Sequence, residues 1–234
     1  MRCDVWWARP TAETPRLLGM LDEIERGRYA NYRREIDRLR FLTGRALIRA
    51  VAGTSLSIEP AAVELDSSCF DCGKPHGKPK VVGSTLEVSI SHSGDRVVLA
   101  VTTGAPVGVD VEEVRAAEVD DLAGIAFSPA ELTVFGAVPE AQRRGAFFTY
   151  WARKEAVLKA TGKGMSLGMT KVTLSGHDEP PRVVATEAAE VDAPNAHLTD
   201  LDAGPDYRAC VAVFATEAPK VTEHDANELI AGLG

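Results

Sequence analysis

The sequence predicts an α+β protein made of two αβ halves that meet near Gly104-Ala105-Pro106. Two observations lead to this fold class. Apolar runs typical of strands and segments with helical periodicity occur on both sides of that junction. The 234 residues are 45% hydrophobic, enough for one large unit or two subdomains that share a core. We expect an N-terminal subdomain over residues 1–105 and a C-terminal subdomain over residues 106–234.

The first half has the pattern of a strand, a long helical segment and a pair of strands. Helical periodicity covers residues 16–51, where apolar positions recur at Leu39, Leu42, Ala46, Leu47 and Ala50. A turn-like segment over residues 91–95 separates the paired strands, and residues 67–80 are expected to form a loop. The strands expected in this half cover residues 3–8, 86–90 and 96–101.

The second half begins with an apolar strand over residues 107–111. Ser128-Pro129-Ala130-Glu131 has the form of a capping box and predicts a helix start. A second helix is expected over Pro139 to Thr161, ending at Gly162. We expect the tail after Ala218 to be peripheral, with Leu229 and Ile230 available to dock a last turn. Further strands are expected over residues 171–174, 182–185 and 207–214.

Charge and composition exclude several classes of protein. The net charge of -8 argues against a general nucleic-acid binder, because such proteins carry a surplus of Lys and Arg. No apolar run approaches the ~20 residues of a membrane helix, and the N-terminus lacks the apolar run of a signal peptide. The four cysteines are too sparse for a secreted disulfide scaffold. We therefore expect a cytoplasmic protein with reduced thiols.

Arginines are concentrated between residues 25 and 49, against only three acidic residues. An acidic protein that gathers arginine in one segment can be forming a local anion site, whereas a solvated helix face with ion pairs is the ordinary alternative. The arginines of this segment are Arg26, Arg28, Arg33, Arg34, Arg38, Arg40, Arg45 and Arg49.

Two acidic residues on the strand over residues 107–111 and its end suggest a metal site. Side chains of a strand alternate, so Asp110 and Glu112 project from one face and Glu113 from the other. Two adjacent carboxylates repel unless a cation or proton lies between them, and Mg²⁺ prefers oxygen ligands. Solvated acids on an edge strand are the alternative, but the neighbouring valines indicate a strand with one buried face.

The long second helix places Glu155 and Lys159 one turn apart on one face. A surface ion pair worth ~0.3 to 0.5 kcal/mol is the simple interpretation. Phe147, Trp151 and Leu158 form a neighbouring stripe that predicts packing against a core. The helix can therefore present a third carboxylate and an ammonium rigidly to the strand acids.

The segment Cys69-Phe70-Asp71-Cys72-Gly73-Lys74-Pro75-His76 contains two thiols and a histidine, which are zinc ligands. A structural zinc site needs a fourth ligand, and none occurs nearby in the sequence. We therefore expect a loop with free thiols in which Cys69 and Cys72 have no assigned role.

Four ordered motifs together resemble the 4'-phosphopantetheinyl transferases, in particular the larger monomeric branch that activates peptide and polyketide synthetases. The resemblance covers about Arg40 to Gly164. Its motifs are Gly77-Lys78-Pro79, Ser89-Ile90-Ser91-His92-Ser93-Gly94, Gly108-Val109-Asp110-Val111-Glu112 and Trp151-x-x-Lys154-Glu155-Ala156-x-x-Lys159.

This resemblance implies a reaction and the residues that perform it. Asp110, Glu112 and Glu155 would hold Mg²⁺ on the pyrophosphate of coenzyme A, and Lys159 would contact the same phosphates. A serine of an acyl or peptidyl carrier protein would attack the phosphorus bonded to pantetheine, and 3',5'-ADP would leave. Glu155, or a water on the metal beside it, would be the base; a carboxylate near a cation is a poor base, so both stay open. Such chemistry needs charge neutralisation and alignment rather than covalent catalysis.

The resemblance also assigns the nucleotide contacts. Ser91 and His92 match residues that contact the phosphates of coenzyme A, and Lys78 borders the nucleotide. Arg40 and Arg45 match a basic helix near the 3'-phosphate, although Arg28 can serve there instead.

The fold implied by the family is two similar αβ subdomains around a pseudo-twofold axis, with coenzyme A in the cleft between them and a monomeric chain. Two other functions remain open. One is a magnesium-dependent nuclease or pyrophosphatase with the same three acids, and the other is a non-enzymatic protein that binds coenzyme A or a carrier.

Overall fold

The computed structural model describes the backbone of all 234 residues and every side chain except that of Met165. The first half of the chain contains one strand, three helices and two strand pairs. In order these are β1 (Arg2–Ala8), α1 (Pro15–Gly19), α2 (Glu23–Asn31), α3 (Glu35–Leu56), η1 (Pro60–Ala62), β2 (Leu65–Asp66), β3 (Lys80–Val81), β4 (Leu86–Ser93) and β5 (Arg96–Thr103).

The second half continues with a strand, three helices, a series of strands and a short last helix. They are β6 (Val107–Glu113), α4 (Val119–Ala126), α5 (Pro129–Gly136), α6 (Glu140–Ala160), η2 (Gly164–Leu167), η3 (Met169–Lys171), β7 (Val172–Leu174), β8 (Val183–Thr186), η4 (Ala193–Asn195), β9 (Ala196–Asp200), β10 (Tyr207–Phe214), β11 (Lys220–Asp225) and α7 (Asn227–Ala231).

The strands form two main sheets and one small one. The larger sheet has six strands in the order β11-β1-β5-β4-β3-β2, and the second has three in the order β6-β10-β9. β7 and β8 form a separate pair. β11 runs parallel to β1, whereas β6 and β10 pair antiparallel with Asp110 opposite Cys210. The acidic strand β6 is thus an edge of its sheet.

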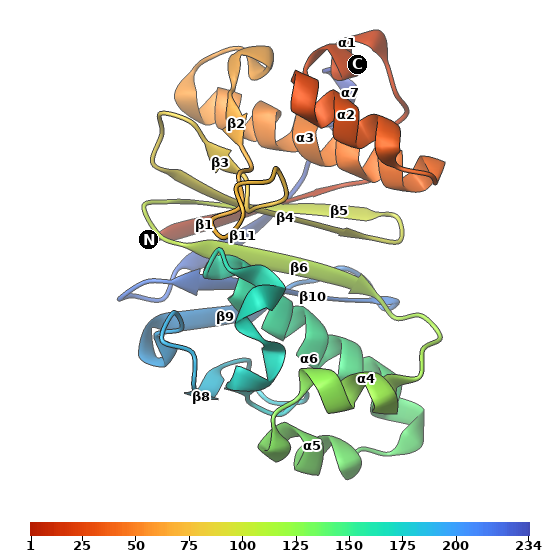
Figure 1. Cartoon of the computed structure of the whole chain (residues 1–234), viewed down its shortest axis with the longest axis vertical. Helices are drawn as coiled ribbons and strands as arrows, with labels where there is room; N and C mark the ends of the chain where they lie inside the picture. Colours follow the sequence, from red (N-terminus) through yellow and green to blue (C-terminus); the bar gives the residue numbers. More distant parts are fainter.

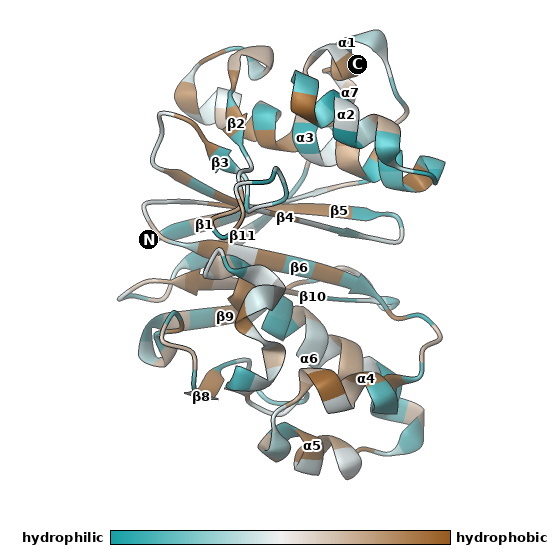
Figure 2. Cartoon of the chain, in the orientation of Figure 1, coloured by the Kyte–Doolittle hydropathy of each residue, from teal (hydrophilic) through white to brown (hydrophobic). Residues whose placement is uncertain are grey.

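The two main sheets stack against each other, and helices cover their outer faces (Figure 1). Valines of β6 and β10 pack between the sheets against Val5, Val98 and Ala100. A second core lies between the six-stranded sheet and the helices α1, α3 and α7. Figure 2 shows hydrophobic residues along β5 and β6, where the layers meet. The mixed α+β fold predicted from the sequence is confirmed.

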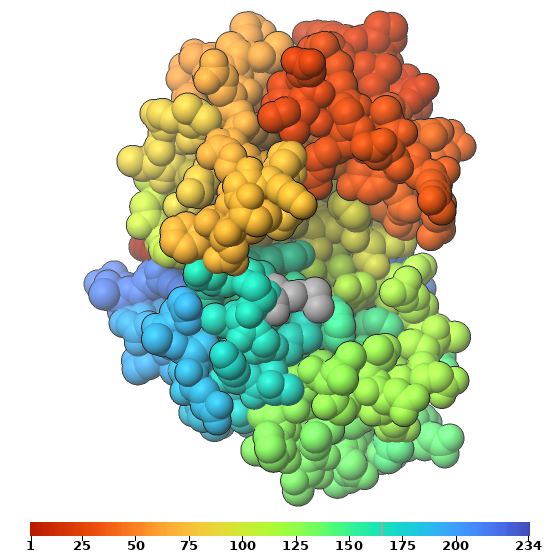
Figure 3. Space-filling model, in the orientation of Figure 1, coloured from red at the N-terminus to blue at the C-terminus, as the bar shows by residue number. Residues whose placement is uncertain are grey.

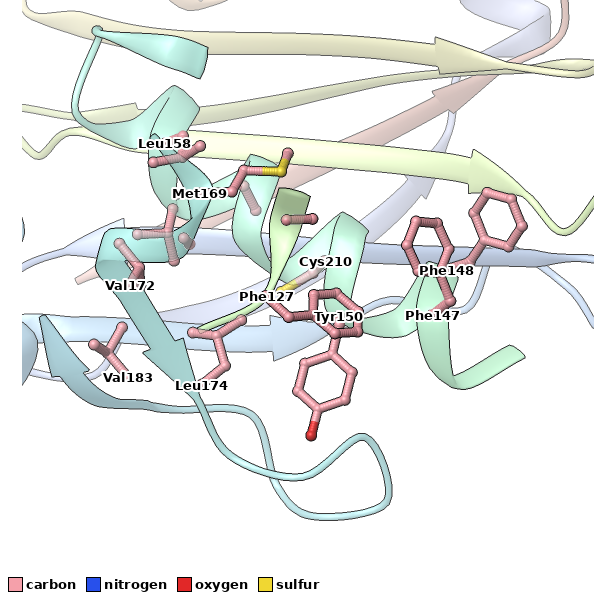
Figure 4. Close-up of a cluster of buried hydrophobic side chains, with 14 of the residues drawn as sticks. Phe127, Phe147, Phe148, Tyr150, Leu158, Met169, Val172, Leu174, Val183 and Cys210 are labelled. Atoms are coloured by element: carbon pink, nitrogen blue, oxygen red, sulfur yellow. The ribbon is translucent and has the colours of Figure 1, made fainter. Parts of the chain in front are cut away.

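The third core surrounds α6 (Figure 4). Phe127 contacts Phe147 and Tyr150 of α6, with ring centroids 5.6 and 4.9 Å apart. Leu158 is fully buried in the same core. Because these rings fix the rotation of α6, the helix presents its remaining face to β6 in one orientation.

Several local predictions are confirmed. Ser128 accepts a hydrogen bond from the backbone N–H of Glu131, and Glu131 accepts one from the N–H of Ser128, which completes the capping box of α5. Helix α6 begins after Pro139, one residue later than expected. None of the described helices has both the length and the apolar composition needed to cross a membrane.

The predicted single helical segment over residues 16–51 is wrong, because three helices occupy it. Asp22 and Glu25 form a capping box that starts α2, and α2 ends at Tyr32, whose backbone is extended. Periodicity continues across such breaks, so it does not reveal them.

Two other expectations also need correction. The strand before the expected turn runs on through Ser93, so Ser91 and His92 lie on β4 and only residues 94 and 95 form the turn. The tail after Ala218 is not peripheral. β11 pairs with β1, and Ile230 of α7 packs in the core of the first half, so these residues lie with the first half of the chain rather than with 106–234.

Candidate active site

Gly108 allows β6 to lie directly against α6. A Cβ at this position would lie 1.9 Å from the carbonyl oxygen of Ala156 and 2.4 Å from the nitrogen of Ala160, so no larger residue fits. The strand alternation then directs Val107 and Val109 into the core between the sheets. Asp110, which has the same parity as Gly108, faces α6 and accepts a hydrogen bond from Lys159.

Asp110 is the most buried acid of the site, with 3% of its surface exposed. Its Oδ1 accepts hydrogen bonds from Ser91 Oγ and Lys159 Nζ, both at 2.7 Å. Its Oδ2 is buried and has no hydrogen-bond partner among the described residues. A buried carboxylate oxygen without a partner is costly, and a cation would satisfy it.

Glu112 and Glu155 are the other two acids near Asp110. Burial and the neighbouring charge of Asp110 raise the pKa of Glu112 to about 7, and Glu112 accepts a hydrogen bond from Ser93 Oγ at 3.1 Å. Burial, followed by the charge of Asp110, also raises the pKa of Glu155. The negative charges of Glu112 and Glu155 are therefore poorly compensated beside Asp110, as expected for groups that bind a cation.

The three acids fit a magnesium ion by donor chemistry rather than by a closed cage. Within the described part of the chain, the only group of three His, Cys, Asp or Glu side chains with ligand atoms all within 4.8 Å of one another is Cys69, Cys72 and His76. The acid oxygens are thus more widely spaced. Mg²⁺ commonly takes one or two carboxylates and fills its other positions with waters and substrate phosphates, so wide spacing is compatible with it.

Lys159 joins the two halves of the protein at this site. Its Nζ lies 2.7 Å from Asp110 Oδ1, 3.2 Å from the Val109 carbonyl and 2.9 Å from Ser91 Oγ on β4. The side chain also lines a cavity of about 520 Å³. Lys159 therefore links the acidic residues to this cavity, because it contacts Asp110 and also forms part of the cavity wall.

Basic residues line the same cavity away from the acids. Arg28, Arg45 and Lys78 are part of its wall. The Nη1 of Arg45 is buried and has no partner among the described residues, although its Nε lies 3.4 Å from Glu25 Oε1. Burial lowers the pKa of Arg45 to about 10, so it remains a cation at neutral pH. An unsatisfied guanidinium donor beside a cavity is suited to binding an anion.

Lys78, Ser91 and His92, which were predicted to contact coenzyme A, differ in their exposure and in their hydrogen-bond partners. Lys78 pairs with Glu87 at 3.1 Å, and burial lowers its pKa. Ser91 bonds to Asp110, and the His92 side chain is exposed.

Arg40 has a different environment from Arg45. It donates to the Gly94 carbonyl at 2.8 Å and to Asp37 at 2.8 Å, and it is absent from the described cavity wall. Arg28, the alternative arginine, does line the cavity. The geometry therefore favours Arg28 and Arg45 over Arg40 as the arginines available to bind a phosphate in this cavity.

The sequence analysis assigned no role to Ser89 and Ser93 on β4, and it assigned Ser91 to the phosphates rather than to Asp110. Ser89 Oγ accepts from the Val109 N–H at 3.0 Å, Ser91 bonds to Asp110, and Ser93 Oγ accepts from the Glu113 N–H at 3.1 Å. These three hydroxyls connect the edge of the second sheet to the first. Their spacing of two residues within Ser89-Ile90-Ser91-His92-Ser93 was the available signal, since such residues share one strand face.

Lys154 belongs to the helix motif but is fully buried away from the cavity. Its Nζ pairs with Glu131 Oε2 at 2.8 Å and donates to the Met169 carbonyl at 2.9 Å. Glu131 Oε1 accepts from the Leu174 N–H at 2.8 Å. Lys154 therefore holds α5, α6 and β7 together instead of contacting a ligand.

The fold and site together define a protein in which two αβ halves share a cavity with acids at one end and basic side chains along its wall. Residues 106–212 match the sequence profile of the 4'-phosphopantetheinyl transferase superfamily, and residues 6–104 match that of the N-terminal region of 4'-phosphopantetheinyl transferase. The chain belongs to this family, which confirms the resemblance found in the sequence.

Three curated relatives illustrate the similarity. The 4'-phosphopantetheinyl transferase HetI of Nostoc sp. is 32% identical over 159 residues, which are 68% of this chain and 66% of HetI. A phosphopantetheinyl transferase of Thraustochytrium sp. is 34% identical over 185 residues, 74% of this chain and 63% of that protein. The slr0495 protein of Synechocystis sp. is 31% identical over 172 residues, 71% of this chain and 68% of that protein. The matched regions of the first two thus span slightly less than two thirds of those proteins.

Among solved structures, the holo-[acyl-carrier-protein] synthase of Thermotoga maritima is a looser match. It has 23% sequence identity and a TM-score of 0.41, over 48% of this chain and 64% of that one.

Proposed function

We propose that the chain transfers 4'-phosphopantetheine from coenzyme A to a serine hydroxyl of an acyl or peptidyl carrier protein. The serine oxygen forms a bond to the phosphorus attached to pantetheine, the pyrophosphate bond on the far side breaks, and 3',5'-ADP leaves. The observation that carries this proposal is the position of Lys159, which contacts Asp110 and at the same time lines the cavity that contains Arg28 and Arg45. A pyrophosphate bound there would have its charge neutralised at both ends.

Asp110, Glu112 and Glu155 are proposed to hold a magnesium ion, which when bound would neutralise phosphate oxygens. The partnerless Oδ2 of Asp110 supports this assignment, because it offers a buried oxygen ligand. Lys159 donates to the pyrophosphate oxygens. Glu155, or a water held beside it, would accept the proton of the attacking serine.

The basic wall is proposed to hold the 3'-phosphate and the nucleotide. Arg45 would donate through its free Nη1, with Arg28 beside it, and Lys78 would border the nucleotide. Ser91 keeps Asp110 and Lys159 oriented. His92, on β4 of the first half, is proposed to contact a phosphate of coenzyme A.

We propose two subdomains divided near residue 105, with β11 and α7 packed on the first one, that are related by a pseudo-twofold axis and act as a monomer. Each half lays one long helix, α3 or α6, across antiparallel strands (Figure 1). Ser91 from the first half and Lys159 from the second meet within one chain at 2.9 Å. The site therefore needs no residue from a second copy.

The decisive experiment supplies coenzyme A, Mg²⁺ and an apo carrier, and measures the mass gained by the carrier together with 3',5'-ADP released. We expect equal amounts of both products and no ADP without the carrier serine. A pyrophosphatase or nuclease would release nucleotide without any carrier, and a binding protein would release none.

The same assay tests the variant Asp110→Asn, and Glu113→Gln is its matched control. Both changes remove one carboxylate from β6, but only Asp110 contacts Lys159. Transfer should be lost in Asp110→Asn and retained in Glu113→Gln. Equal activity of both variants would contradict the proposed metal site.

A further inference from the structure

The loop between β2 and β3 brings together three soft metal ligands. Cys72 Sγ lies 3.0 Å from His76 Nε2, and the ligand atoms of Cys69, Cys72 and His76 all lie within 4.8 Å of one another. A tetrahedral zinc ion with Zn–S bonds of about 2.3 Å places its ligands roughly 3.5 to 3.8 Å apart. Small side-chain movements would therefore bring these three atoms into a zinc coordination sphere.

The backbone of this loop positions the two cysteines. The Cys69 N–H donates to the Lys74 carbonyl at 2.8 Å, and the Gly73 N–H donates to the Cys69 carbonyl at 2.8 Å. Gly73 has φ +69°, a left-handed conformation that glycine adopts without strain. Gly77 has no room for a Cβ, which would lie 2.6 Å from the Ser68 carbonyl oxygen.

Apolar packing does not explain why the ligands converge. Phe70, between the two cysteines, is 85% exposed, and Cys72 and His76 are exposed as well. A tight exposed turn that points two thiols and an imidazole at one another without a core beneath them is typical of a metal-binding loop.

We propose that Cys69, Cys72 and His76 bind one zinc ion, with water as the fourth ligand. Each cysteine binds as a thiolate and releases its proton to solvent, and His76 binds through its neutral Nε2. The two thiolate charges cancel that of Zn²⁺, so the loop gains no net charge. Thiolates select zinc over magnesium, which keeps this site chemically distinct from the oxygen ligands of Asp110 and its neighbours.

The zinc site forms part of the cavity wall. Cys69, Cys72 and His76 line the same cavity as Lys159 and Lys163. Arg28 donates to the Pro75 carbonyl at 2.8 Å, and Lys163 lies 3.5 Å from Asp71 and 4.3 Å from the Phe70 ring centroid. Figure 3 shows this amber loop resting against the teal segment that follows α6. Zinc would therefore fix the loop that closes this side of the cavity.

The test measures metal and needs no transferase activity, so it stands apart from the proposed function. The full chain is purified, dialysed with excess Mg²⁺, and analysed for zinc by mass spectrometry. We expect one zinc per chain, and its loss in Cys72→Ser and His76→Ala. Lys74→Ala is the matched control, because it changes the same loop without removing a ligand and should retain the metal.

A second measurement on the unmutated chain covers variants that fail to fold. Replacement of zinc by Co²⁺ should give the absorption of tetrahedral cobalt with thiolate charge-transfer bands, and a mercurial that modifies Cys69 and Cys72 should release the metal. The proposal is overturned by a chain that binds no zinc, by a cobalt spectrum without thiolate bands, or by a disulfide between Cys69 and Cys72 in the chain purified under reducing conditions.

Discussion

Arg45→Ala should weaken the binding of coenzyme A through its 3'-phosphate. The Nη1 of Arg45 is buried beside the cavity without a described partner, so it is free to donate a charge-assisted hydrogen bond. Such a bond contributes about 1.5 to 3 kcal/mol. That free energy corresponds to roughly a ten- to hundredfold increase in the Michaelis constant for coenzyme A, with a smaller effect on kcat.

The fold should survive this substitution. Glu25, the other partner of Arg45, keeps its two hydrogen bonds from Arg49 at 2.7 and 3.2 Å, so no buried carboxylate loses its last partner. The unfolding midpoint of the variant, measured by circular dichroism, checks this expectation.

The assay compares coenzyme A with dephospho-coenzyme A, which lacks the 3'-phosphate. Arg45→Ala should have much less effect on the second substrate, whereas Lys159→Ala should impair both alike, because they share the pyrophosphate. Arg40→Ala is the matched arginine control, since Arg40 is bonded to Gly94 and Asp37. An equal loss on both substrates in Arg45→Ala would refute its assignment to the 3'-phosphate.

Three further predictions concern the site and the helix behind it. Asp110→Asn should reduce kcat at least about a hundredfold, since it removes a carboxylate proposed to hold the magnesium ion that stabilises the phosphate charge in the transition state. Calorimetry should find the unfolding temperature of this variant preserved. Glu131→Ala should lower stability by about 3 to 5 kcal/mol in denaturant unfolding, because it leaves the Lys154 ammonium buried without its carboxylate; the double variant Glu131→Ala with Lys154→Met should cost clearly less, because no unpaired charge stays buried, and a double variant less stable than Glu131→Ala would contradict the buried-pair explanation. Gly108→Ala should displace α6 and abolish transfer, because the new Cβ meets the Ala156 carbonyl at 1.9 Å; Gly124→Ala, where nothing lies within 4 Å, should leave activity and stability intact.

Local rules predicted the elements whose ends are set by nearby residues. The capping box of α5 depends on hydrogen bonds within one turn, and α6 begins after Pro139 and ends before Gly162, so residues next to these helix ends specify them. The break between α1 and α2 was missed although Asp22 and Glu25 form a capping box of their own. The signal was present there, but continuous periodicity concealed it.

The acid pair on β6 illustrates a site that alternation alone could place. Asp110 and Glu112 bond to Ser91 and Ser93 respectively, so they project from one face as predicted. Their electrostatic state could not be predicted, because the raised pKa of Glu112 depends first on burial, and burial is created by packing against another sheet.

The sequence by itself determined the family, the α+β class and the set of acidic and basic residues from which a site could be built. Only the tertiary structure decided that Arg45 has a free donor at the cavity while Arg40 is occupied at the β4–β5 turn. The tertiary structure also decided that β11 pairs with β1, where Arg2 lies opposite Lys220, 218 residues later in the chain. The physical reason is the same in both cases. Strand pairing and side-chain partners depend on contacts between residues far apart in the chain, and short-range patterns carry no information about which of those contacts form.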